Sequence, residues 1–142
     1  FTDPEEKFEI GKAQKMISGT DVTIMSYGHM VWKSIEAEAI LQADDISVEV
    51  INMHTVKPLD VRAVLNAVKK TGCIVTAEEH NINGGLGESV ARVLGQNEPC
   101  PQEFVAVNDS FGESGTPDQL LEKYGLSTDN IVLAAKRAIS RK

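Results

Sequence analysis

The chain has 142 residues, of which 42% are hydrophobic and 25% are charged, as expected for one globular domain. Fourteen Lys and Arg residues stand against 21 Asp and Glu residues, which gives a formal net charge of −7. This acidity argues against nucleic acid as a partner, because binding to a phosphate backbone depends on clustered cations. The longest apolar run, Ile131–Ala135, is far shorter than the ~20 residues of a membrane-spanning helix, so we expect no membrane partner.

The two cysteines and the first residue bear on the origin of the chain. Cys73 and Cys100 match no metal or redox motif, and one pair is too few for a disulfide framework. Cys73 begins an apolar run and is predicted to be a buried small hydrophobe. A reducing, cytoplasmic compartment fits this usage best. Because the chain opens with Phe1 and shows no secretory leader, we expect it to be trimmed or cut from something longer.

Four short apolar runs predict strands that are covered on both faces. These runs are Val22–Ser26, Val48–Ile51, Cys73–Ala77 and Phe104–Val107. Helical patterns lie between and after them. Strands that alternate with helices of this length imply right-handed βαβ crossovers and a mainly parallel sheet.

The predicted helices have recognisable ends. After Asp60, a candidate N-cap, apolar residues recur at helical spacing up to a stop at Gly72. Thr116 begins a capping-box pattern, and Ser127 is a candidate cap for the last helix. The predicted helices are about His29–Gln42, one from Val61 to the stop at Gly72, one from Leu86 closed by Gly95, one from Thr116 to Gly125, and one after Ser127.

The first of these helices is apolar on two sides, which is typical of a helix buried on two sides. This pattern predicts a second packing partner for the helix, from another domain or another subunit. One stripe holds Val31, Trp32, Ile35 and Ala39, and the other side holds Met30, Ala37 and Leu41.

The three histidines, His29, His54 and His80, each follow a predicted strand. They are therefore expected near the carboxyl edge of the sheet, where open α/β folds bind ligands. Nothing in their spacing brings three rings to one point, as a zinc site requires, so no metal site is predicted. One interpretation is that the histidines are simply polar residues of connecting loops. The alternative interpretation is that one of them acts as a proton donor or contacts an anion.

The loop from Glu78 to Gly87 is the segment richest in chemistry. Its glycines allow a tight turn and expose N–H groups at a helix start, which favours an anion. A structural turn, an anion-binding site and an interface loop are all consistent with this pattern. Glu78 and Glu79 are not expected to act as a pair, because neighbours on an extended chain point in opposite directions. The candidate anion-binding residues are His80, Gly84, Gly85 and Gly87.

No motif in the chain is a catalytic signature. The loop that leaves the fourth strand holds Asp109 and Ser114, and turn formation or helix capping accounts for both residues. Ser114 has no nucleophile elbow around it. We therefore predict no catalytic, cofactor-binding or metal-binding residue in this chain.

At three loops the sequence resembles the C-terminal domain of transketolases, particularly the short type encoded as two separate halves. The resemblance covers about Phe8–Ala138, and its motifs occur in the order and spacing of that family. The motifs are Ser26-Tyr27-Gly28, Lys57-Pro58-Leu59-Asp60, Glu78-Glu79-His80 with Gly84-Gly85-Leu86-Gly87, then Asp109, Phe111-Gly112, Ser114-Gly115 and Tyr124-Gly125-Leu126.

The resemblance implies a three-layer α/β/α domain around a five-stranded mixed sheet, mostly parallel, with an antiparallel first strand at the edge. Phe8–Gln14 would supply that strand. The whole chain, residues 1–142, would be one domain, and residues 1–7 would be a linker remnant from a preceding domain.

The resemblance also implies an enzyme of the pentose phosphate pathway that transfers two-carbon ketol units between sugar phosphates, with thiamine diphosphate and Mg²⁺. In that family other domains hold the cofactor, so this domain would serve assembly, as part of a homodimer. Deoxyxylulose-phosphate synthase and the β subunits of 2-oxoacid dehydrogenases share the domain and remain alternatives. A free-standing module that binds a small anion is a further alternative.

Overall fold

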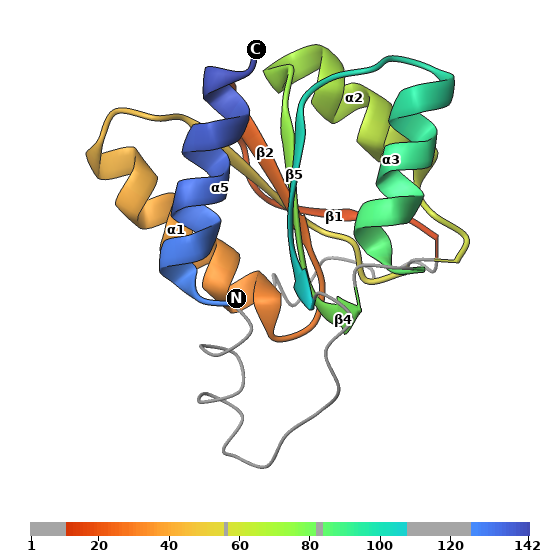
Figure 1. Ribbon diagram of the computed structural model, residues 1–142, viewed down its shortest axis with the longest axis horizontal. Coiled ribbons are helices and arrows are strands. Elements are labelled where there is room, and N and C mark those ends of the chain that lie inside the picture. Colours follow the sequence, from red (N-terminus) through yellow and green to blue (C-terminus); the bar gives the residue numbers. More distant parts are fainter. Residues whose placement is uncertain (1–10, 56, 82–83, 108–125) are drawn as a thin grey trace.

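The computed structural model describes residues 11–55, 57–81, 84–107 and 126–142 of the chain. In these residues a five-stranded sheet lies between two layers of helices (Figure 1). Helices α1 (Met30–Ala43) and α5 (Thr128–Ser140) cover one face, and α2 (Val61–Thr71) and α3 (Leu86–Gln96) cover the other. The predicted three-layer α/β/α fold is confirmed.

The sheet is mixed, with the strand order β1-β3-β2-β4-β5. Strand β1 pairs antiparallel with β3 at one edge, and the other neighbouring pairs are parallel, as predicted. The chain order reverses between β2 and β4, because β2 leads through α1 to β3 and β4 leads through α3 to β5 on the other side. The strands are β1 Gln14–Ile17, β2 Val22–Ser26, β3 Val48–Asn52, β4 Ile74–Asn81 and β5 Gln102–Val107.

The first strand lies later in the chain than the predicted Phe8–Gln14. It begins at Gln14, opposite Asn52 of β3, and ends at Ile17. Of the described residues in the predicted range, 11–13 belong to no strand, and Gly11 has φ +82°, a left-handed conformation that interrupts regular extended pairing. Residues 1–10, with the predicted linker remnant, lie outside the described residues.

Two apolar clusters fill the spaces on either side of the sheet. Alternate residues of β2 point to opposite faces, so Ile24 packs with α1 and α5 while Met25 packs with α2 and α3. Every residue of β2 is buried, which confirms that this strand is covered on both faces. Cys73 is also fully buried, as predicted.

The helix ends follow the sequence signals in the described residues. Asp60 Oδ1 accepts a hydrogen bond from the backbone N of Ala63 at 3.0 Å, and Gly72 ends α2 with φ +77°. Ser127 Oγ accepts from the backbone N of Asn130 at 3.2 Å. Helix α3 continues through the predicted stop at Gly95 and ends one residue later. The predicted helix from Thr116 to Gly125 lies outside the described residues.

Candidate functional site

The reversal of strand order between β2 and β4 places the candidate site at the carboxyl ends of these strands, where open α/β folds bind ligands. Glu78 of β4 lies there, and its side chain is fully buried. Its two carboxylate oxygens accept hydrogen bonds from the backbone N atoms of Leu86 at 2.8 Å and Gly87 at 2.7 Å. A carboxylate of the chain itself therefore occupies the start of α3.

Tyr27 follows β2 and reaches toward the same carboxylate across the reversal point. Its hydroxyl lies 3.5 Å from Glu78 Oε1, at the outer limit of a hydrogen bond. Burial raises the pKa of Tyr27, and the negative charge of Glu78 and then the hydrogen bond to it raise it further. Tyr27 thus keeps its proton at neutral pH and can donate to Glu78.

The two neighbouring glutamates point in opposite directions, as the alternation of an extended chain predicts. Glu78 is buried, whereas Glu79 is exposed. Strand parity places Glu78 on the same face as Ile74, toward α2 and α3. Val75 and Ala77 on the other parity are buried as well, so parity alone could not show that Glu78 is buried and Glu79 is not. The partners of Glu78 could not be read from the sequence, because they are backbone atoms across a loop.

The predicted anion site at His80, Gly84, Gly85 and Gly87 stays a prediction. Gly84 N donates to Glu88 Oε2 at 2.6 Å, and Gly85 is the N-cap residue of α3. Since Glu78 already accepts from Gly87 N, an anion at this helix start would have to displace that carboxylate. His80 belongs to β4 rather than to a loop after it, and its side chain lies outside the described residues.

The other two histidines lie after their strands, as predicted. His29 is the N-cap residue of α1 and makes no side-chain capping bond. His54 Nδ1 lies 3.1 Å from Thr55 Oγ1. Among the residues that the structure describes, no group of three or more His, Cys, Asp or Glu side chains could hold a metal ion.

Gly87 has a packing role that the sequence analysis missed. A Cβ atom at this position would lie 2.5 Å from the ring of Phe104 and 2.9 Å from Thr76 Oγ1. The side chain of Gln102 also donates to the Gly87 carbonyl at 2.9 Å. Helix α3 can approach β4 and β5 this closely only because residue 87 has no side chain.

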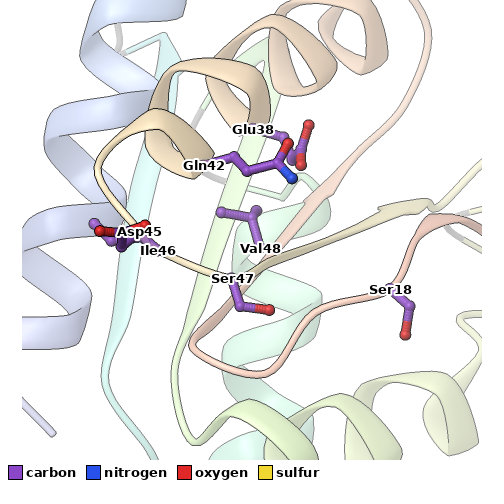
Figure 2. A pocket seen from close by; sticks show the side chains of 7 residues that line it. All are labelled: Ser18, Glu38, Gln42, Asp45, Ile46, Ser47 and Val48. Atoms are coloured by element: carbon purple, nitrogen blue, oxygen red, sulfur yellow. The ribbon is translucent and has the colours of Figure 1, made fainter.

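A separate hollow of about 230 Å³ lies at the opposite, amino end of the parallel strands. Glu38 and Gln42 of α1 project over it, while Asp45 lies apart from them (Figure 2). Ser47 Oγ in its wall accepts from the backbone N of Thr20 at 3.0 Å and so secures the turn before β2. This hollow is acidic and remote from Glu78, and we assign it no part in the candidate site.

The comparison with known proteins identifies the architecture. Over residues 11–131 the chain matches the family described as "Transketolase, C-terminal domain". The chain belongs to this family. The 6-deoxy-6-sulfo-D-fructose transketolase subunit SqwH of Clostridium sp. (strain MSTE9) is 46% identical over 137 residues, which cover 96% of this chain and 42% of the relative. A putative transketolase C-terminal section of Methanocaldococcus jannaschii is 39% identical over 128 residues, which cover 89% of this chain and 40% of the relative.

A solved structure supports the same assignment. It is described as "Split gene transketolase, inactive beta4 tetramer", and it matches with a TM-score of 0.95 at 43% identity. The match covers 99% of this chain and 46% of that one. The transketolase C-terminal domain described here therefore spans less than half the length of these relatives. 1-Deoxy-D-xylulose-5-phosphate synthases are also among the relatives, as the predicted alternative allows.

The described residues do not fit the thiamine diphosphate and Mg²⁺ that the family implies. A diphosphate at the start of α3 would need the N–H groups that Leu86 and Gly87 give to Glu78. The described part of the chain also lacks a cluster of side chains that could hold the metal. We therefore derive no reaction step through the cofactor on this domain.

The layer of α1 and α5 carries large apolar side chains at the surface. Trp32 and Ile40 of α1 are 51% and 43% exposed, and Leu133 of α5 is 51% exposed. The predicted side of α1 with Met30, Ala37 and Leu41 is buried. The other predicted stripe is split, because Val31 is buried whereas Trp32 is exposed. No helix in the described residues is long and apolar enough to cross a bilayer.

Proposed function

We propose that this domain serves the assembly and support of an enzyme that transfers two-carbon ketol units between sugar phosphates. Other domains or a partner subunit would hold thiamine diphosphate and Mg²⁺ and carry out the chemistry. The observation that carries this proposal is the pair of hydrogen bonds between Glu78 and the start of α3. The chain's own carboxylate accepts from the helix N–H groups that would otherwise favour a phosphate. A cytoplasmic homo-oligomer, in the simplest case a homodimer, is part of the proposal.

The outward face of α1 and α5 is the proposed contact with the rest of the enzyme. Trp32, Ile40 and Leu133 leave apolar surface exposed on these two packed helices. Apolar aromatic side chains are enriched in the cores of protein interfaces. The relatives are more than twice as long as this chain, and the matching solved structure is described as a tetramer, which supports a partner domain or subunit for this face.

The substrate of the whole enzyme is a separate question. One relative is named for 6-deoxy-6-sulfo-D-fructose, which lies outside the pentose phosphate pathway, so membership of the family does not fix the sugar. The alternative is the same supporting role in a 1-deoxy-D-xylulose-5-phosphate synthase or in a 2-oxoacid dehydrogenase. A ketol-transfer assay and a 1-deoxy-D-xylulose-5-phosphate synthase assay on the assembled enzyme distinguish a transketolase from such a synthase.

The assembly role can be tested with two charge substitutions. In the assembled enzyme, Trp32→Glu and Leu133→Glu should each lower the molar mass measured by light scattering, because burying an unpaired carboxylate in an interface is costly. Asn66→Glu is the matched control, since Asn66 is exposed on α2 in the opposite layer. An unchanged mass for both variants would rule out this face as the contact.

A further inference from the structure

A second hollow lies at the carboxyl edge of the sheet, on the face of α2 and α3. Its volume is about 470 Å³, which is within the usual range for small-molecule sites. One wall is the segment from Lys57 to Val61 that leads into α2, and the other runs from Gly84, just before α3, to Val93 of that helix. In Figure 1 this yellow segment passes beside the first turns of α3, drawn in green. We call it the Lys57–Arg92 hollow.

The charges that line this hollow favour an anion. Lys57 and Arg92 are exposed, and neither forms an ion pair with any of the described residues. Glu88 is the acidic residue of the lining, and its Oε2 is bound to Gly84 N at 2.6 Å. The Lys57–Arg92 hollow therefore carries one net positive charge, on a chain whose net charge is −7.

The rest of the lining is mainly apolar. Leu59 and Val61 come from the first wall, and Val93 comes from α3. Ser89, one turn before Val93, adds a hydroxyl that can donate to an oxygen. Apolar surface with a few polar groups that fix orientation is the usual make-up of a small-ligand site.

We propose that the Lys57–Arg92 hollow binds a small organic anion with a phosphate or carboxylate head and a short apolar body. The guanidinium of Arg92 can hold such a head through two parallel hydrogen bonds, and the Lys57 ammonium adds a point charge. The apolar body lies on Leu59, Val61 and Val93. This site does not use the backbone N–H groups of Leu86 and Gly87, which Glu78 occupies, and it does not depend on the proposed assembly role.

The test is a calorimetric titration of the full-length, assembled protein with inorganic phosphate and with butyl phosphate. Both probes should bind, and butyl phosphate should bind about threefold more tightly or better, because its chain buries apolar surface. Arg92→Gln and Lys57→Gln should each weaken binding about fivefold. Glu88→Gln should strengthen it about threefold, because it removes the nearby negative charge. Arg62→Gln removes an exposed cation of α2 outside the hollow and should change nothing.

Three results would overturn the proposal. The first is that neither probe binds at millimolar concentration. The second is that Arg92→Gln and Arg62→Gln weaken binding equally, which would mean diffuse attraction to surface cations. The third is that the probes do not bind while Arg92→Gln lowers the molar mass of the assembled protein. That result would mean that a side chain of a partner fills the hollow. Because the assembly test uses Trp32 and Leu133, the two proposals can fail separately.

Discussion

Glu78 Oε2 accepts a hydrogen bond from the backbone N of Gly87 at 2.7 Å, across nine residues of sequence. The bond joins the end of a central parallel strand to the first turn of the helix that follows it. A helix start carries free N–H groups and a positive dipole end, so a buried carboxylate is well stabilised there. The position at which many α/β proteins bind a ligand phosphate is thus used internally to fix α3.

Replacing Glu78 with Gln should destabilise the domain by about 2 kcal/mol. The amide retains one acceptor oxygen but places an NH2 group against a backbone N–H, which leaves a buried donor without a partner. Chemical denaturation of the wild type and the variant measures this difference. Glu79→Gln is the control, since Glu79 is exposed on the same strand and should change the free energy of unfolding by less than about 0.5 kcal/mol. Equal effects of the two substitutions would contradict the assigned role of Glu78.

Gly87→Ala should destabilise the domain by about 1–3 kcal/mol, because the new Cβ would overlap the ring of Phe104. Gly95 provides a matched control in the same helix, since a Cβ there meets nothing within 4 Å. Gly95→Ala should stabilise the protein by roughly 0.5–1 kcal/mol, as alanine favours a helix interior. Thermal or urea unfolding of both variants measures the contrast. A stabilising Gly87→Ala would show that α3 does not pack as described.

The helix ends show how far the sequence can predict this fold. Asp60, Gly72 and Ser127 act through atoms three or four residues away, so local patterns predicted them correctly. The first strand was placed too early, because its position depends on pairing with β3 and on the left-handed turn at Gly11. Strands that pair across more than thirty residues of sequence leave no local pattern that shows where the pairing begins.

The candidate site was less predictable than the fold. The Gly-rich loop correctly indicated a helix start, but the sequence could not show that Glu78 would accept hydrogen bonds from its N–H groups. The contact between Gly87 and Phe104 likewise depends on how closely α3 approaches β5. The sequence placed Val31 and Trp32 on one apolar stripe of α1, but in the packed domain Val31 is buried and Trp32 is exposed.

Glu103 should make the stability of the domain sensitive to acid. Burial alone would raise the pKa of Glu103, but hydrogen bonds from Arg137 and Arg141 outweigh burial and hold this pKa below its usual value. Because the pKa of Glu103 is lower in the folded state, its ionised carboxylate stabilises the fold at pH values above the pKa of the unfolded state, about 4.3. This stabilisation is lost as the pH falls through the lower pKa of the folded state. Glu103→Gln should therefore cost about 1 kcal/mol or less at pH 7 and nothing in strong acid.

Urea unfolding at several pH values measures this dependence on Glu103. The wild type and Glu103→Gln should differ near neutral pH and converge below the folded pKa. A difference that grows as the pH falls would contradict the lowered pKa.

The two cysteines should differ in their reaction with a thiol reagent such as dithionitrobenzoate. Burial raises the pKa of Cys73 to about 11, and the side chain is inaccessible, so it should react only after unfolding. Cys100 is partly exposed; burial, and then the charge of Glu98, raise its pKa, so it should react slowly in the native state. In a Cys100→Ser variant no native labelling should remain. Rapid labelling of that variant would contradict the burial of Cys73.

We propose that this domain supports a transketolase-like enzyme without holding its cofactor. The most direct test is a calorimetric titration of the 142-residue chain with thiamine diphosphate in the presence of Mg²⁺, together with a ketol-transfer assay on the same sample. We predict neither binding nor turnover, because Glu78 occupies the start of α3. Micromolar binding of the cofactor, or turnover by this chain alone, would contradict the account.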